Sequence, residues 1–189
     1  MSYVFVIIKI LQEEYLSDFL DGKIYMNTDS YFTNIESDGF LRADTHEGAD
    51  QAIQFKEIAI ENSEGEFVPI GGAISPMIYR SGNVGARNIL CTYMYTDKPG
   101  FKFDTRNLGF GDKAVIIKDF NEFVKRVDLA ISSVGKRLLH GPVEYVNKSE
   151  YHGTMGPFRK FSEYNYQSEF RFVVLGGKAT KPEALQLNI

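Results

Sequence analysis

The sequence lacks the features that mark secreted and membrane proteins. It has a single cysteine, Cys91, so no disulfide bond can form within the chain. The longest purely apolar stretch near its start, Val4–Ile8, is interrupted by Lys9. It is far shorter than the ~20 residues of a membrane span or the core of a signal peptide. We therefore expect an intracellular protein with no targeting segment, located in the cytoplasm.

An excess of positive charge is also absent. The 21 basic residues face 25 acidic ones, which gives a formal net charge of −4. This balance gives no electrostatic reason to bind a phosphate backbone or an anionic membrane surface, so we expect neither general nucleic-acid binding nor membrane association. At 189 residues the chain is long enough to bury one core without disulfides or a structural metal, and we expect a single domain over residues 1–189.

Tryptophan is missing, yet aromatic residues make up 14% of the chain, because it has 11 tyrosines and 15 phenylalanines. The two kinds of ring are distributed differently. Several phenylalanines follow helix or strand periods and are typical of core residues, namely Phe120, Phe123, Phe170 and Phe172. Several tyrosines cluster at loops and strand ends, namely Tyr25, Tyr31, Tyr151, Tyr164 and Tyr166. A ring with a polar tip at such places favours a tyrosine-lined cleft.

Hydrophobic periodicity predicts an α+β fold. Strands are expected at residues 3–10, 23–26, 53–60, 67–70, 88–95, 113–117, 142–146 and 169–175. Helices are expected at residues 11–20 and 120–138, with a capping-box-like start at Asp119 and Glu122. The turn 62–66 joins two strands into a hairpin, and residues 179–189 are expected to form a loosely held tail.

A polar row precedes and enters the last predicted strand. Gln167, Glu169 and Arg171 alternate with Ser168 and Phe170, so their side chains share one face of a strand. A polar row costs desolvation on a buried strand unless it is paired or lines a cleft. Two interpretations stand: a functional site, or an edge strand with a solvated face and an ion pair.

Residues 36–50 form a polar loop with neither helix nor strand period, which is typical of a functional loop. The spacing of Asp44, His46, Glu47 and Asp50 matches neither a calcium-binding loop nor the His-Glu-x-x-His pattern, so we expect no metal. A loop that folds back over a cleft suits these charges better. Arg42 then either pins the loop through an internal ion pair or binds a ligand phosphate or carboxylate.

Other patterns that carry chemistry are not found in the sequence. The glycine pairs form neither a dinucleotide-binding fingerprint nor a P-loop, and no histidine has a nucleophile at a recognisable spacing. Cys91 lies in an apolar run, residues 88–95, where a small buried hydrophobe fits better than a reactive thiol.

The order of short motifs nevertheless resembles a family of uncharacterised bacterial and phage proteins, distantly similar to ADP-ribosyltransferases. The motifs lie at residues 23–27, 31–32, 42–48, 119–126, 143–146 and 166–171. The resemblance implies a mostly antiparallel, split β-sheet core with flanking helices and a cleft for NAD. It places Glu169 as the glutamate that holds the ribose 2′-hydroxyl and stabilises the oxocarbenium-like transition state. Gln167 matches a residue that orients the acceptor.

The same resemblance assigns the remaining ligand-binding residues. Tyr25 and Tyr31 fall where an aromatic ring stacks on nicotinamide, close to Asn27. Lys9 stands where such enzymes usually have arginine or histidine. Together with Arg42 and Arg171, these residues form the expected binding set for a nucleotide or NAD-type molecule.

Three functions remain open: transfer of ADP-ribose from NAD to a macromolecule, non-catalytic binding or sequestration of a nucleotide signal or a host-defence protein partner, and a phage structural accessory role.

Overall fold

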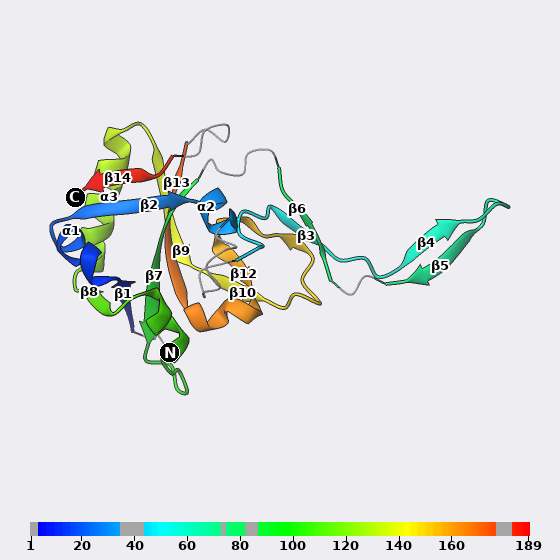
Figure 1. Cartoon of the computed structure of the whole chain (residues 1–189), viewed down its shortest axis with the longest axis horizontal. Helices are drawn as coiled ribbons and strands as arrows, with labels where there is room; N and C mark the ends of the chain where they lie inside the picture. Colours follow the sequence, from blue (N-terminus) through cyan, green and yellow to red (C-terminus); the bar gives the residue numbers. More distant parts are fainter. Residues whose placement is uncertain (1–3, 35–43, 73–74, 82–86, 177–182) are drawn as a thin grey trace.

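A computed structural model of the chain describes residues 4–34, 44–72, 75–81, 87–176 and 183–189. The fold is α+β, and its largest unit is a seven-stranded antiparallel sheet (Figure 1). The strands of this sheet are β1 (Phe5–Leu11), β2 (Lys23–Thr28), β7 (Asn88–Thr96), β8 (Lys113–Ile117), β9 (Arg137–Pro142), β13 (Glu169–Leu175) and β14 (Leu185–Asn188). The predicted strands at 3–10, 23–26, 88–95, 113–117 and 169–175 are thereby confirmed to within a few residues.

The sheet is split along one edge of its central strand, β7. On one side, residues 88–93 of β7 pair continuously with β13. On the other side, β1 pairs with residues 93–96 of β7, and β2 pairs with residues 88 and 89. Residues 90–92 pair with neither β1 nor β2, so the two strands diverge from β7 and leave an opening between them.

Helix α3 (Phe120–Ser133) covers one face of the sheet (Figure 1). Its Val127 and Ile131 are fully buried in the main core, whose sheet residues are Ile7, Ile24, Met26, Leu90, Phe170, Phe172, Val174 and Leu187. As predicted, the Asp119 carboxylate caps the helix by accepting a hydrogen bond of 2.9 Å from the Glu122 amide. These contacts fix α3 against β13.

Helix α3 is shorter than the sequence predicts. It ends at Ser133 rather than near residue 138, because Gly135 adopts the left-handed backbone conformation (φ +70°) that ends helices. Leu138, the end of the predicted helix, instead pairs with Val174 in the sheet. Apolar residues that continue the helical period thus belong to the following strand, β9.

The expectation of a loose C-terminal tail is wrong for residues 185–188. They form β14, which pairs with β2 and buries Leu187. Alternation of Leu185 and Leu187 with polar residues is the strand pattern that explains this pairing. The tail is further held at Gly22 (φ +83°), whose carbonyl accepts from the Ile189 amide and where a side chain would collide with the Ile189 carbonyl.

The predicted first helix is a short one in two parts, the 3-10 helix η1 (Glu13–Tyr15) and α1 (Leu16–Leu20). After β2, the chain forms α2 (Asp29–Asn34), which begins where the Thr28 hydroxyl accepts a hydrogen bond from the Tyr31 amide. This local capping by a threonine side chain places Tyr31 beside the end of β2.

A second group of short strands packs beside the main sheet. It contains the three-stranded sheet β11 (Gly153–Thr154), β3 (Gln51–Ile53) and β6 (Met77–Tyr79), and the parallel pair β10 (Glu144–Val146) and β12 (Arg159–Phe161). Pro142 therefore ends β9 instead of starting the predicted strand 142–146. The other described 3-10 helices are η2 (Thr105–Phe110), η3 (Gly156–Phe158) and η4 (Ser162–Gln167). A second apolar cluster lies here, made by Ala49, Ala52, Val146, Met155 and Phe161.

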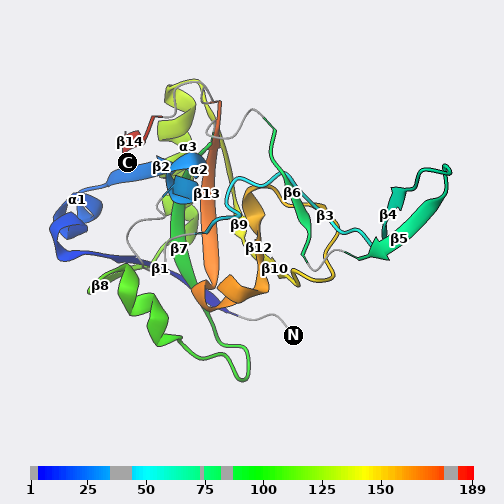
Figure 2. The same ribbon diagram turned by 45° about the vertical axis from the view of Figure 1, so that its right-hand side comes forward.

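Strands β4 (Ile58–Glu61) and β5 (Phe67–Gly71) form the predicted hairpin, with Gly65 (φ +80°) in its turn. Residues 54–57 separate β4 from β3, so the single strand predicted at 53–60 is two strands. The hairpin extends far from the rest of the molecule in two views (Figures 1 and 2). We call residues 56–72 the arm. Among the described residues, no helix has the length and apolarity needed to cross a membrane.

Candidate functional site

A pocket of about 540 Å³ lies where β1 and β2 diverge from β7. Residues 90–92 of β7 line it, together with side chains from β1, β2, α2, η2, η4 and β13. The volume falls within the roughly 300–1,000 Å³ typical of small-molecule sites. The split in the sheet thus creates a cavity of ligand size.

The pocket brings together residues that the sequence separates by up to 177 positions, from Lys9 to Gln186. Every predicted site residue within the described ranges lines it: Lys9, Tyr25, Asn27, Tyr31, Gln167, Glu169 and Arg171. Arg42 lies outside the described residues. Of the five clustered tyrosines, Tyr25 and Tyr31 line the pocket, whereas Tyr151, Tyr164 and Tyr166 do not.

Strand β13 directs its charged residues toward the pocket because it alternates. Phe170, Phe172 and Val174 pack into the main core under α3, so Glu169 and Arg171 face the opposite side. The edge-strand interpretation of this segment is wrong, since β13 pairs with β7 on one side and β9 on the other. The ion pair of that interpretation does exist, but it is buried rather than solvated.

Gln167 is not on the strand as the alternation predicts. It ends η4, and Ser168 follows with a left-handed backbone (φ +39°), which is uncommon for a residue other than glycine. The Ser168 hydroxyl donates to the Met94 carbonyl and its own carbonyl accepts from the Met94 amide, both at 2.7 Å. These bonds hold the sharp turn that presents Gln167 and Glu169 to the same cavity.

Arg171 is the centre of a buried charge network. Its side chain is only 1% exposed. Nε donates to Glu169 Oε2 at 2.6 Å, and the two terminal nitrogens donate to the two carboxylate oxygens of Glu47 at 2.9 and 2.6 Å. Nη1 also donates to the Pro157 carbonyl at 2.6 Å. This bidentate pair fixes the described end of the 36–50 loop against the pocket, as expected for a loop that folds back over a cleft.

Lys160 is the second cation of the network, and sequence reasoning missed it. Its ammonium donates to Glu169 Oε1 at 2.9 Å and to Gln167 Oε1 at 2.7 Å. It also lies 3.6 Å from Asp44 Oδ2 and 3.8 Å from Glu47 Oε2. A signal did exist, because Asp44, Glu47 and Glu169 together require more than one cation if all three are buried.

The network keeps Glu169 ionised. Burial alone raises the pKa of its carboxyl, but Arg171 and Lys160 outweigh this effect and hold the pKa at about 2. The same two cations lower the pKa of Glu47 against its burial. Burial prevails at Asp44, whose pKa is raised despite Lys160. At neutral pH the pocket therefore contains a fixed carboxylate, Glu169, that cannot act as a proton donor.

The β7 wall beside the network is less charged, and its Cys91 is the direct cross-strand partner of Arg171. The Lys9 ammonium donates to the Cys91 carbonyl at 2.9 Å, in the segment of β7 that the split leaves without β1 or β2. The Cys91 side chain is half-buried in this wall, rather than part of the core. Burial raises the pKa of the Cys91 thiol to about 12, so it is protonated and unsuited to nucleophilic attack.

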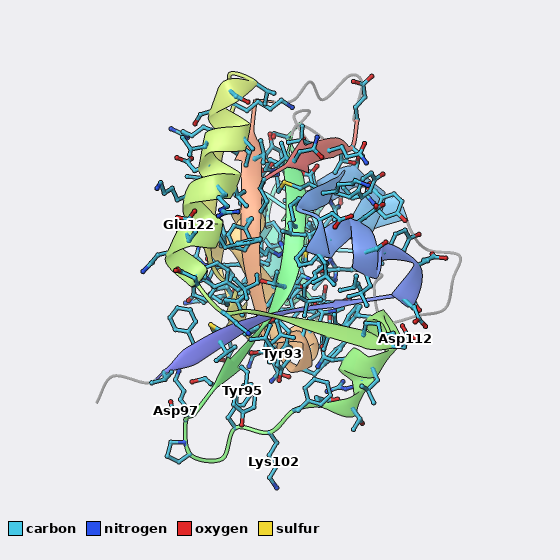
Figure 3. All side chains as sticks on the ribbon, turned by 90° about the vertical axis from the view of Figure 1, so that its left-hand side faces the viewer. Tyr93, Tyr95, Asp97, Lys102, Asp112 and Glu122 are labelled. Carbon is cyan, nitrogen blue, oxygen red and sulfur yellow. The ribbon has the colours of Figure 1, made fainter. Side chains whose placement is uncertain are left out.

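Aromatic rings surround the pocket at its other sides. Tyr25 and Tyr31 are 57% and 46% exposed, which leaves their rings available at the mouth. Tyr93 closes the end near the β7 terminus, with its ring centroid 5.3 Å from that of Phe103. Figure 3 shows Tyr93 and Tyr95 at this end of β7, with Glu122 on α3 across the sheet. The rings give the pocket flat apolar surfaces beside its fixed charges.

His46 lies outside this arrangement. Its Nε2 is 3.0 Å from the Lys148 ammonium, and its ring packs edge-on against Phe161. Over the residues that the structure describes, no group of three or more histidine, cysteine, aspartate or glutamate side chains is placed to hold a metal ion.

Comparisons with protein-family models, curated proteins and solved structures found no match to this chain.

Proposed function

We propose that the pocket binds a nucleotide, with NAD as the first candidate, and that the protein transfers ADP-ribose from NAD to a macromolecule. The observation that carries the proposal is the position of Glu169. This ionised carboxylate lies in a ligand-sized cavity together with Gln167 and the tyrosines that the resemblance to ADP-ribosyltransferases selects.

The chemistry requires a fixed negative charge. The bond between ribose C1′ and the nicotinamide nitrogen breaks, and its electron pair leaves with nicotinamide. The positive charge that develops on the ribose is stabilised by the Glu169 carboxylate. A nucleophile of the acceptor then bonds to C1′ and releases its proton. A pKa of about 2 keeps Glu169 charged throughout. In this proposal Gln167, which lines the same pocket, orients the acceptor.

Glu169 retains capacity for a ligand although Arg171 and Lys160 each engage one of its oxygens. A carboxylate has about four lone-pair positions, so each oxygen can accept a second hydrogen bond, such as one from a ribose hydroxyl. The two cations meanwhile fix its orientation. Preorganised charge of this kind is effective because it needs no rearrangement during the reaction.

The tyrosines at the mouth suit the planar parts of the ligand. Tyr25 and Tyr31 project from neighbouring segments, β2 and α2, and both rings are about half exposed. A half-exposed ring can stack on nicotinamide or on a base and keep its hydroxyl in water. Asn27, between them in sequence, adds an amide donor and acceptor.

A second candidate function is nucleotide binding without transfer, as in a phage protein that sequesters a signal or binds a host-defence partner. One observation favours it. The first strand, β1, contributes Lys9 rather than arginine, and the Lys9 ammonium donates to the Cys91 carbonyl. A lysine lacks the planar fork that binds phosphate at two points, so it binds a dinucleotide less firmly.

The test of transfer is release of nicotinamide from NAD by the purified protein. Glu169→Gln is expected to reduce the rate by about 100-fold or more, since the charge is lost while the hydrogen-bonding shape is kept. Glu122→Gln is the matched control, because Glu122 lies on α3 at the surface, and its rate should equal that of the wild type. Turnover that survives Glu169→Gln would contradict the assignment.

A variant at the mouth guards against loss of folding. Tyr31→Ala removes an exposed ring and leaves the charge network intact, so the protein should fold normally and bind NAD about tenfold more weakly. Thermal melting with NAD, ADP-ribose and cyclic nucleotides separates the two functions. A ligand at 100 times its Kd adds roughly 2.7 kcal/mol of stability. A shift without nicotinamide release supports binding alone, and no shift with any ligand contradicts both functions.

A further inference from the structure

Asn107 is a buried polar residue of the pocket that lies outside the charge network. It belongs to η2 and is only 1% exposed, and it lines the pocket. Its amide nitrogen, Nδ2, donates to the Asp104 carbonyl at 3.0 Å and to the Tyr166 carbonyl at 2.7 Å. These two bonds use both hydrogens of the amide nitrogen. They also fix the orientation of the amide, because a flipped amide would point its oxygen at two carbonyl oxygens.

The amide oxygen of Asn107, Oδ1, is left for a ligand. Over the residues that the structure describes, the hydrogen bonds of this side chain are the two that its nitrogen donates. No fully buried side-chain nitrogen or oxygen in the same residues is without a hydrogen-bond partner. An oxygen without a partner therefore reaches accessible space, and the space that Asn107 lines is the pocket. The pocket thus contains a fixed acceptor that cannot donate.

Helix η2 holds this acceptor rigidly. The Asp104 carboxylate caps its start by accepting a hydrogen bond of 2.9 Å from the backbone amide two residues later. At its other end, a Cβ on Gly111 would collide with the Leu11 backbone, so the chain after η2 packs directly against the end of β1. The bond from Asn107 to Tyr166 ties η2 to η4. A preorganised acceptor of this kind binds without the cost of ordering a loop.

A flat apolar surface lies beside the acceptor. Phe110 follows Asn107 by three residues in η2, and residues i and i+3 of a 3-10 helix lie on the same side. Both residues line the pocket. Tyr93, the cross-strand partner of Glu169, adds a second ring to the lining. An acceptor beside aromatic rings suits a planar heterocycle with an N–H donor on its edge.

The acceptor and the tyrosines of the mouth lie at different ends of the pocket. Asn27, next to those tyrosines in sequence, pairs with Ile89 of β7. Asn107 is bonded instead to η4, and Ser168, which follows η4, is bonded to Met94 of β7. Ile89 and Met94 are about 16 Å apart along an extended strand. A ligand with two ring systems therefore reaches both ends when it is extended.

We propose that Oδ1 of Asn107 accepts a hydrogen bond from the 6-amino group of adenine and makes the pocket specific for adenine nucleotides. This inference rests on the proposed function, in which an NAD-type ligand stacks its nicotinamide on Tyr25 or Tyr31. The adenine then occupies the other end, beside Phe110. An oxygen that only accepts favours an amino group and disfavours a carbonyl group at the same position, because two acceptors would face each other.

Isothermal titration calorimetry of the wild type with NAD and two analogues tests the proposal. Nicotinamide hypoxanthine dinucleotide has a carbonyl group in place of the 6-amino group of adenine. The analogue with 3-acetylpyridine has a methyl group in place of the amide nitrogen of nicotinamide and keeps the adenine. The hypoxanthine analogue is expected to bind at least about tenfold more weakly than NAD, because Oδ1 of Asn107 loses its donor.

Asn107→Ala shows whether this residue makes the distinction. The variant is expected to bind NAD and the hypoxanthine analogue to within about threefold of each other, since the acceptor is gone, and to keep the wild-type ratio between NAD and the acetylpyridine analogue.

Asn88→Ala is the matched control. Asn88 is 2% exposed, and its Nδ2 donates to the Met26 and Glu183 carbonyls, but it does not line the pocket. This variant loses the same two kinds of hydrogen bond as Asn107→Ala and should keep the wild-type preference for NAD over the hypoxanthine analogue.

The comparison of ligands on the wild type needs no variant, so it decides the matter even if Asn107→Ala does not fold. Equal binding of NAD and the hypoxanthine analogue would overturn the role of Asn107 and leave the proposed function standing. So would a preference that Asn107→Ala retains, that Asn88→Ala also abolishes, or that Asn107→Ala removes for the acetylpyridine analogue instead. No binding of NAD or of either analogue would contradict both proposals.

Discussion

Strand β13 buries charged residues, whereas the arm exposes apolar ones, so both regions depart from the usual placement of polar residues outside and apolar residues inside. β13 buries six of its seven residues, and two of these, Glu169 and Arg171, are charged. The arm exposes all residues of its two strands, although these include isoleucine, phenylalanine and valine. Charge inside and apolar surface outside are both unfavourable in an isolated folded chain.

The two exceptions differ in how they are resolved. In β13 the cost is met within the chain, since Glu47 and Lys160 complete the hydrogen bonds and neutralise the charges. For the arm, nothing in the described part of the chain supplies a cover. The buried charges thus have their partners within the chain, whereas the apolar side chains of the hairpin remain exposed.

The largest expected effect comes from breaking the network. Arg171→Met should lower the free energy of unfolding by about 3–5 kcal/mol, because Glu47 and Glu169 remain buried with Lys160 as their shared cation. Urea unfolding measures this loss. The control is Arg126→Met on α3, which removes an exposed partner of Glu122 and should have little effect on stability. Equal effects of the two substitutions would show that the network does not contribute to stability in this way.

The second-largest expected effect is a loss of folding stability when the pH is lowered. The pKa of Glu169 is about 2 in the folded protein, against an ordinary value of 4.5, so the folded state binds its proton less readily than the unfolded state. Its contribution is complete above about pH 5 and is lost as the pH falls toward 2, a change on the order of 3 kcal/mol. The raised pKa of Asp44 opposes part of this loss.

Urea unfolding between about pH 6 and pH 3 measures the acid effect. The loss of stability on acidification should be smaller in Glu169→Gln, which has no proton to gain at this position. An identical pH dependence in the variant and the wild type would contradict the low pKa of Glu169.

The smallest expected effect on stability comes from the same substitution, valine to alanine, made once in each region. Val173→Ala removes two buried methyl groups from β13 and should cost about 2 kcal/mol. Val68→Ala removes the same atoms from the arm and should change the stability of the rest of the molecule by less than about 0.5 kcal/mol. Thermal unfolding at low-micromolar concentration measures both. A large loss for Val68→Ala under these conditions would mean that the arm packs against its own chain.

Much of the candidate site follows from sequence patterns. Alternation before and within β13 identifies Gln167, Glu169 and Arg171 as a polar group that needs partners, and local capping at residues 27–30 places Tyr31 near Asn27. Lys160 could not be found in this way. It lies in β12, a strand of only three residues, which is too short for a period in the sequence to assign a direction to its side chain. Its role depends on contacts with Asp44 and Glu47, more than 100 residues earlier.

The fold shows the same limit. Strong periods predict β1, β7, β13 and the start of α3, because an apolar face must be buried wherever it occurs. The end of α3 and the strand β14 are not predicted, since each depends on a competing partner. Leu138 continues the helical period but is held by Val174 in the sheet, and Leu187 is buried only because β2 lies beside it.

The sequence by itself determined the α+β class, the positions of most strands and the residues whose polarity conflicts with burial, because these depend on local periodicity and on residue chemistry. Only the tertiary structure decided that β1 and β2 diverge from β7, that the resulting opening collects Lys9, Tyr25 and Glu169, and that the arm stands away from the body. These features depend on which distant segments pair and pack, since a pocket or an uncovered face is a relation between segments rather than a property of any one of them.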